Sequence, residues 1–318
     1  MINNKIKEIY YGLFSGALWG VAGTLLEMML MDKNLKTILV APIILAFAND
    51  FISSGYMLFH LIRKKYSIKK VLLGRNTLII VAAALLGGPI GMSCYLIAIQ
   101  YIGVGYAAAI SASYPALGAL MAFVFIKDKL SKMGVCGILL SVIATMLLGY
   151  SASTNSSFCW IGFTFALVCA LVCALSWGLE VIISSYGMKK SIPPDFAYFI
   201  RQVSASLGYL TLFVMIIPLD NIKECYAMTS KIMPHIFMIS LITTVSYLYY
   251  YRAINIIGPV RAMGLNITYA VWAILLGWFL LSNQINFQLI ILCCFIILGS
   301  FLTIISPKKS SKLLRYNK

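Results

Sequence analysis

The sequence predicts an all-α polytopic membrane protein with ten transmembrane helices, arranged as two inverted five-helix repeats. Three observations lead to this prediction: the apolar composition, the spacing of long apolar runs, and an internal repeat. Of the 318 residues, 61% are hydrophobic and only 11% are charged, whereas a soluble domain is nearer half apolar and a quarter charged. The composition therefore favours a membrane protein over a soluble one.

The apolar runs set the number of spans. A bilayer core of about 30 Å takes roughly 20 residues to cross as an α-helix, and ten runs of the chain are long enough. Turns around Gly103 and Gly258 separate the third run from the fourth and the eighth from the ninth. The ten runs lie at about 10–31, 38–61, 77–99, 106–126, 133–151, 158–187, 196–217, 233–255, 260–281 and 287–305.

The formal charge of +16 raises the question of a nucleic-acid partner. With the N-terminus inside and ten helices threaded, nineteen Lys and Arg residues fall on the cytoplasmic side, and only Lys33, Lys36, Lys223 and Lys231 fall outside. The positive-inside rule accounts for this distribution. We therefore expect no nucleic-acid partner, but a multi-pass protein of the plasma membrane with both termini cytoplasmic, present as a monomer or a homodimer.

Two stretches of the chain repeat each other without gaps. AIQYIGVGYAAAISASY (Ala98–Tyr114) aligns with AINIIGPVRAMGLNITY (Ala253–Tyr269), and SGALWG (Ser15–Gly20) answers CALSWG (Cys173–Gly178). Each copy contains five spans, an odd number, so the second copy must enter the membrane from the opposite side. Inverted repeats of this kind are typical of transporters that hold their substrate near the midplane.

The repeat divides the chain into two predicted domains. The first five-helix repeat covers residues 10–151 and the second, inverted one covers residues 158–305. A basic cytoplasmic tail follows at residues 306–318.

Five charged residues lie within the apolar runs: Glu27, Asp50, Glu180, Arg201 and Arg252. Insertion of a charged side chain near the bilayer centre costs about 2.5–3.5 kcal/mol on insertion scales. Such groups therefore face the bundle interior and usually have a functional role. We expect Glu27 to reach the outer interface and Arg252 to extend toward the inner one. Glu180 has two interpretations: a structural ion pair with Arg201, or a countercharge for a substrate.

The second interpretation depends on the aromatic neighbours of Glu180. Trp177 and Ser184 share its helix face, because residues three and four apart are neighbours on a helix, and Trp19 occupies the equivalent place in the first span. Aromatic rings and few donors suit a quaternary ammonium, which each ring face attracts by roughly 0.5–2 kcal/mol. Further candidates, taken from helical spacing, are Tyr114, Tyr247, Asn266, Tyr269 and Trp272.

The chain lacks the motifs of an enzyme or a nucleotide-driven pump. GVG at 103–105 follows no strand, and there is no Walker motif and no Ser/His/Asp or metal-binding constellation. We therefore expect no catalytic residues, no metal and no cofactor.

Several motifs together resemble a known family. GPIGM (Gly88–Met92), SASYPAL (Ser111–Leu117), CALVCALSWGLEVIISS (Cys169–Ser185), SYLYYYRAIN (Ser246–Asn255) and GLNITYAVW (Gly264–Trp272) are similar to those of the drug/metabolite transporter superfamily. Within it, the EamA-type members and, more closely, the LicB-type choline permeases resemble this chain over essentially its full length.

The resemblance implies import of choline, with its ammonium in an aromatic and acidic pocket. It carries that role onto Trp19, Asp50, Trp177, Glu180, Tyr247, Asn266 and Tyr269. Two departures are visible: Asn49 stands where the family is expected to have a His, and Arg252 adds a charge to a run expected to be neutral.

The expected function is a secondary transporter that imports choline by alternating access. An inside-negative potential contributes about 2.3 kcal/mol per 100 mV for a monovalent cation, so uniport suffices, and protons are an alternative driving ion. Betaine and carnitine rank lower because Glu180 would repel their carboxylates. The alternatives are an exporter of drugs, metabolites or amino acids with the same fold, in which Arg201 meets a substrate carboxylate, and a non-transporting scaffold.

Overall fold

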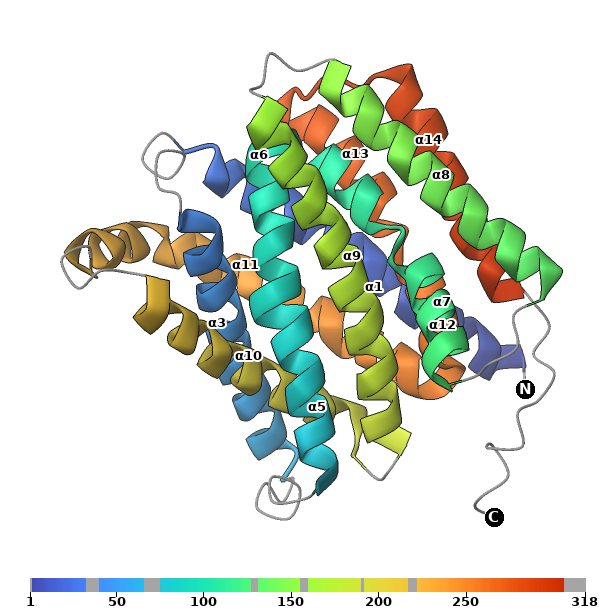
Figure 1. Ribbon diagram of the computed structural model, residues 1–318. Helices are drawn as coiled ribbons and strands as arrows, with labels where there is room; N and C mark the ends of the chain where they lie inside the picture. Colours follow the sequence, from blue (N-terminus) through green and yellow to red (C-terminus); the bar gives the residue numbers. More distant parts are fainter. Residues whose placement is uncertain are drawn as a thin grey trace, which may run out of the picture.

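The computed structural model describes residues 2–32, 40–65, 75–126, 131–154, 160–189, 192–216 and 222–305, and every regular element within them is a helix (Figure 1). The helices are α1 (Ile2–Leu30), α3 (Ala41–Arg63), α5 (Arg75–Leu85), the π-helix η1 (Leu86–Met92), α6 (Ser93–Ser111), α7 (Tyr114–Ile126), α8 (Lys132–Thr154), α9 (Trp160–Lys189), α10 (Pro194–Ile216), α11 (Ile222–Ile257), α12 (Pro259–Asn266), α13 (Tyr269–Leu281) and α14 (Phe287–Ile305). The predicted all-α class is confirmed. The basic tail at 306–318, Lys33 and Lys36 lie outside the described residues. Lys223 and Lys231 lie in α11, but the structure does not describe their side chains.

The ten predicted spans correspond to these helices. The third span consists of α5, η1 and the first part of α6, and the ninth consists of α12 and α13 together. By length and composition, five of the described helical segments are apolar enough to cross a membrane, and α8 and α14 contain shorter apolar helices.

Both predicted turns are present at glycines with positive φ. Gly103 has φ +77° and ψ 160° inside α6, and Gly258 has φ +88° and ψ 160° before α12. This backbone region is essentially restricted to glycine, because a Cβ atom would clash there. The two residues occupy equivalent positions in the repeat, so each copy turns its chain between the third and fourth spans in the same way.

The packing of the helices follows the internal repeat. In the second copy α9 is equivalent to α1, α10 to α3, α11 to the third span and α14 to α8. Equivalent partners pack on each other across the bundle: α3 lies against α10, and α8 lies along α14 (Figure 1). The first helix of each repeat packs on helices of the other repeat. Helix α1 packs on α11 and α13, and α9 packs on α5, η1, α6 and α7. The fold is therefore two five-helix repeats of inverted orientation, as predicted.

Small residues bring α1 close to the α12–α13 segment. A Cβ atom added at Gly16 would lie 2.6 Å from the Asn266 carbonyl oxygen, and one added at Gly20 would lie 2.5 Å from the Cβ of Trp272. Membrane helices lack a strong hydrophobic force between them and associate by such close packing of small residues. This contact brings Trp19 next to the break between α12 and α13.

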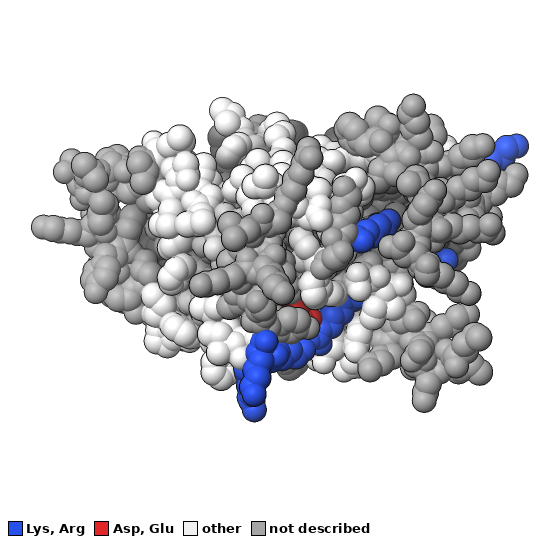
Figure 2. Space-filling view, turned by 90° about the horizontal axis from the view of Figure 1, so that it is seen from below, with Lys and Arg blue, Asp and Glu red and all other residues white. Residues whose placement is uncertain are grey.

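The bundle has two ends, which we name after the two glycine turns. The Gly103 end contains the end of α1, and the Gly258 end contains the start of α1 and the end of α14 (Figure 1). Viewed from the Gly258 end, Lys and Arg side chains lie in small groups, one of which borders an acidic side chain (Figure 2).

Candidate functional site

Two tryptophans from equivalent positions of the repeat meet in the middle of the bundle. Trp19 of α1 and Trp177 of α9 are both buried, and their ring centroids lie 5.6 Å apart in an edge-to-face arrangement. Tyr247 of α11 packs 5.0 Å from Trp19, and Tyr95 of α6 packs 5.0 Å from Trp177. We call these four rings the aromatic cluster. Such edge-to-face pairs contribute about 0.5–1.5 kcal/mol beyond the area that they bury.

The glycines of the π-helix η1 make room for the α9 side chains. A Cβ atom at Gly87 would overlap the Glu180 carboxyl group, and one at Gly91 would lie 2.9 Å from Cδ1 of Trp177. The indole Nε1 of Trp177 donates to the Gly87 carbonyl at 3.2 Å. A π-helix leaves some carbonyls free of their usual helical partners, and short π segments are frequent at functional sites.

A buried charged triad lies beside the aromatic cluster. Arg201 of α10 donates from Nη1 to Asp50 Oδ2 at 2.7 Å and from Nε to Glu180 Oε1 at 3.1 Å. The three side chains are between 1% and 4% exposed. The ion pair between Glu180 and Arg201 is thus confirmed, and Asp50 joins it from the other repeat. With both carboxylates ionised, the triad carries one uncompensated negative charge.

Neutral polar groups complete the hydrogen bonding of the triad. Gln202 accepts from Arg201 and donates to Asp50 Oδ1 at 3.3 Å, and Asn49 donates to the same oxygen at 3.2 Å. The hydroxyl of Tyr251 donates to Glu180 Oε1 at 3.1 Å. Buried ions are tolerated only when such bonds replace the lost hydration, so these residues fix the positions of the charges.

Arg201 also contacts the aromatic cluster. Its guanidinium carbon lies 5.0 Å from the centroid of the Tyr247 ring, within the range of a cation–π interaction. One face of Tyr247 is therefore already used by a cation of the protein itself.

Broken helices supply the polar groups on the other side of the cluster. The fourth span is interrupted at Ala112 and Ser113, and the ninth at the equivalent residues Ile267 and Thr268. Such discontinuous helices at matching places in two repeats are typical of transporter substrate sites.

The side chains beside these breaks form a network. Tyr114 donates to Asn266 Oδ1 at 3.0 Å, and Asn266 donates to the Ser15 hydroxyl at 2.8 Å. The hydroxyls of Ser111 and Tyr269 are 2.6 Å apart. The network ties α1 to the breaks in both repeats.

These groups enclose a small central pocket of about 20 Å³. That space suits about one water molecule, so the rings are closed upon one another in this structure. The lining residues are Ser15, Trp19, Tyr114, Trp177, Glu180, Val181, Ser246, Tyr247, Tyr250 and Asn266.

The structure brings together most of the residues predicted from the sequence. Six of the nine line the central pocket: Trp19, Tyr114, Trp177, Glu180, Tyr247 and Asn266. Tyr269 packs 6.3 Å from Trp177, and Asp50 is linked to the pocket through Arg201.

Trp272 is a correction to the prediction. Its side chain is 44% exposed, and it does not line the central pocket. Two steps of three residues along a helix rotate the face by about 120°, and the break at Ile267 and Thr268 lies between Asn266 and Trp272. The spacing of Asn266, Tyr269 and Trp272 therefore does not define one face.

Several residues of the site were not among the predicted ones, including Ser15, Tyr95, Gln202 and Tyr250. Ser15 precedes Trp19 by four and so shares its helix face, a signal that would have found it. Gln202 directly follows Arg201 and reaches the same carboxylate, but nothing in the sequence indicates where it points.

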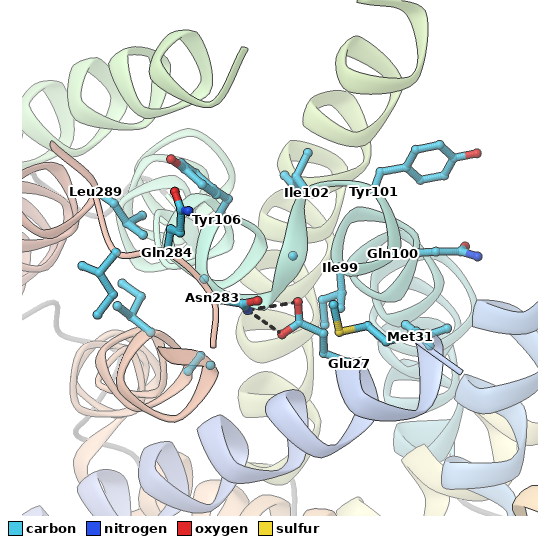
Figure 3. A pocket seen from close by; sticks show the side chains of 17 residues that line it. Glu27, Met31, Ile99, Gln100, Tyr101, Ile102, Tyr106, Asn283, Gln284 and Leu289 are labelled. Atoms are coloured by element: carbon cyan, nitrogen blue, oxygen red, sulfur yellow. Dashed lines mark hydrogen bonds between the residues drawn. The ribbon is translucent and has the colours of Figure 1, made fainter. Parts of the chain in front are cut away.

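A second cavity, of about 300 Å³, lies at the Gly103 end. Glu27 lines it and accepts bonds from the backbone N–H of Val104 at 3.1 Å and from the Asn283 side chain (Figure 3). Glu27 is only 3% exposed, so the expectation that it reaches the outer interface is wrong. The Glu27 carboxylate, which accepts from the Val104 N–H, thereby holds the turn that follows Gly103.

A charged cluster lies at the Gly258 end. Arg252 donates two bonds of 2.9 Å to Asp195, and His60 Nε2 and Lys64 each lie 3.0 Å from the same carboxylate. Arg252 is therefore paired within the protein. Burial of Asp195 opposes its ionisation, but these hydrogen bonds together hold its pKa below the usual range. Because His60 and Lys64 come from the first repeat, the cluster joins the two halves.

Metal ligation finds no support in the part of the chain that the structure describes. No group of three or more His, Cys, Asp and Glu side chains there could hold a metal ion.

Comparison with known proteins bears on the two repeats directly. The EamA-like transporter family matches residues 6–150 and again residues 164–305. The chain belongs to this family. It is therefore a multi-pass membrane transporter, and the two matched segments correspond to its two repeats.

Individual relatives agree with this assignment. The chain is 33% identical to Protein LicB of Haemophilus influenzae over 281 residues, which cover 88% of this chain and 91% of the relative. It is 25% identical to an uncharacterized transporter of Clostridium kluyveri, over 83% of this chain and 84% of that one. A solved crystal structure superposes with a TM-score of 0.61 at 16% identity, covering 94% of this chain and 98% of the other, and shows the same fold.

Proposed function

We propose that this transporter imports choline, or a close quaternary-ammonium relative, across the plasma membrane. The observation that carries the proposal is the charge of the triad: two buried carboxylates share one guanidinium beside four aromatic rings. A monovalent cation in the central pocket balances the remaining negative charge, which is otherwise expensive to bury.

The neighbouring rings select the kind of cation. A quaternary ammonium donates no hydrogen bonds, so it gains little from polar partners but is attracted to ring faces. Trp19 and Trp177 offer such faces, and Ser15 and Asn266 supply polar groups for a hydroxyl. A zwitterion such as betaine brings its own carboxylate and leaves the charge of the triad unbalanced.

The site supports choline better than an amino-acid exporter. An amino acid needs a free cationic partner for its carboxylate, and Arg201 is the buried cation at this place. Arg201 already donates to both Asp50 and Glu180, so it is not available for a substrate carboxylate.

Transport by alternating access requires the central pocket to open. Trp19 belongs to the first repeat, whereas Trp177 and Tyr247 belong to the second. Rocking of one repeat against the other therefore separates these rings, and the broken fourth and ninth spans allow the bend. We place the Gly103 end outside and both termini in the cytoplasm, in agreement with the positive-inside rule.

The membrane potential supplies the driving force in this proposal. It favours entry of a monovalent cation by about 2.3 kcal/mol per 100 mV. A proton balances the same triad charge as the substrate does, so the two compete for it, and proton coupling is a second source of energy.

The test is uptake of labelled choline into proteoliposomes under an imposed inside-negative potential. Glu180→Gln keeps the size of the side chain and makes the triad neutral, so we expect the apparent choline affinity to fall on the order of 10–100-fold, equivalent to about 1.4–2.7 kcal/mol. Trp19→Phe should also weaken uptake, whereas the exposed Trp272→Phe is the matched control and should not.

Two results would contradict the proposal. Absence of saturable choline uptake by the native protein excludes choline as its substrate. Full uptake by Glu180→Gln shows that this carboxylate only holds Arg201 in place. Thermal unfolding of each variant in detergent separates loss of function from loss of fold.

A further inference from the structure

The cavity at the Gly103 end is large enough for a small organic cation. Its volume of about 300 Å³ lies at the lower end of the range for small-molecule pockets. Glu27 enters it from α1, while Tyr106 and Gln284 lie on the side toward α13 and α14 (Figure 3).

Glu27 lacks a charged partner among the described residues. Its carboxylate accepts from the Val104 N–H and, at 3.4 and 3.3 Å, from Asn283 Nδ2. Both donors are neutral, in contrast to the triad, where Arg201 offsets one of two charges. A buried carboxylate without a cation is expensive, so this cavity favours a cationic ligand.

The cavity and the aromatic cluster lie at different depths along α1. Glu27 and Trp19 are separated by two turns of α1, or about 12 Å. Between them, a Cβ atom at Gly23 would lie 3.1 Å from the Tyr95 hydroxyl, and the Tyr95 ring packs on Trp19 and Trp177.

Tyr95 gives a second indication of a ligand between the two sites. Its hydroxyl is fully buried and has no hydrogen-bond partner in the described part of the chain. Buried hydroxyls are normally hydrogen-bonded. A ligand that carries an acceptor or a hydroxyl would satisfy Tyr95 as it passes Gly23.

We propose that the Glu27 cavity is a second cation site, which binds an alkylammonium before it passes Tyr95 into the central pocket. The inference rests on the proposed function for its direction and its ligand class. It gives the transporter two negatively charged sites in series, Glu27 near the Gly103 end and the triad at the centre, with Tyr95 between them.

The experiment measures equilibrium binding of labelled tetramethylammonium to the purified full chain, without transport. Glu180→Gln removes the charge of the central site, so this variant should retain one site. The double variant Glu27→Gln with Glu180→Gln should lose it, with affinity lowered at least about tenfold. Glutamine keeps an acceptor for the Val104 N–H, so the turn stays capped.

Two further variants separate charge from structure. Asn283→Ala keeps the charge of Glu27, and in the Glu180→Gln background binding should persist. Asn283→Lys places an ammonium beside Glu27, so binding should be lost although the carboxylate is intact. If Glu27→Gln does not fold, Asn283→Lys decides the question.

Three outcomes overturn the inference. The first is complete loss of binding in Glu180→Gln alone, and the second is binding that survives in the double variant. The third is displacement of tetramethylammonium from the Glu27 site by equimolar sodium, which would assign the cavity to inorganic cations. Because binding is measured directly, the two proposals are tested separately. A failure of choline uptake does not contradict the Glu27 site, and a failure of the Glu27 site does not contradict choline uptake.

Discussion

Substitution of Gly87 by alanine tests how tightly η1 and the triad fit. The added Cβ atom would overlap the Glu180 carboxyl group and lie 2.9 Å from its Cγ. The carboxylate must therefore move away from Arg201 Nε and the Tyr251 hydroxyl, each 3.1 Å distant. Hydrogen bonds to charged groups contribute about 1.5–3 kcal/mol each, so losing both lowers the free energy of unfolding by roughly 3–6 kcal/mol.

Gly55→Ala is the matched control for this measurement. Gly55 also lies in a helix, and an added Cβ atom there meets nothing within 4 Å. Alanine should stabilise this position by roughly 0.5–1 kcal/mol, because glycine is the poorer helix former. The assay is reversible unfolding in mixed micelles with increasing SDS, accompanied by choline uptake in proteoliposomes.

A double-mutant cycle isolates the contact. In a Glu180→Ala background the carboxyl group is absent, so Gly87→Ala should cost little. If Gly87→Ala alone were as stable and as active as Gly55→Ala, the Glu180 carboxyl group would not be held against η1.

Two further predictions concern the charged groups. Arg201→Met leaves Asp50 and Glu180 buried without a cation, so unfolding in mixed micelles should show a loss of about 3–5 kcal/mol. Asp195→Asn removes the ion pair with Arg252, and the free energy of unfolding near neutral pH should fall by roughly 1–2 kcal/mol. The folded-state pKa of Asp195 lies below its usual value, so its stabilisation is complete above about pH 4 and is lost as the pH falls further. The stabilities of the native protein and Asp195→Asn should therefore converge in acid, and a difference that grows in acid would contradict this.

The residue pattern of the sequence was sufficient to predict the fold. Glycines in a repeated IG context predicted the turns at Gly103 and Gly258, and the shared Trp-Gly predicted that Trp19 and Trp177 occupy equivalent places. Both signals are local, because a turn and a repeat are visible in a few adjacent residues.

The irregular helices were not predictable in the same way. Pro89 lies in residues 86–92, but nothing in the sequence indicates that these residues form a π-helix against α9. The break at Ile267 and Thr268 contains no glycine or proline, and it misled the assignment of Trp272. Contacts with other helices determine these features, and hydropathy does not record them.

The sequence also could not determine which residues form the triad. Glu180 and Arg201 lie on consecutive spans, so their ion pair was one of two open alternatives. Asp50 joins them through the contact of α3 with α10, a pairing that only the inverted packing creates. The carboxylate of Glu27 was misplaced because α13 and the following segment cover it, which depth along α1 alone does not reveal.

The sequence separation within the triad has a consequence for biosynthesis. Asp50 and Arg201 are 151 residues apart, and chains grow at about 5–20 residues per second. Asp50 is therefore translated roughly 8–30 s before its guanidinium partner. Throughout that interval the nascent first repeat carries a mid-span acid that costs about 2.5–3.5 kcal/mol to insert. The two halves consequently mature as one unit, and an N-terminal fragment released early by the ribosome would be a natural substrate for membrane quality control.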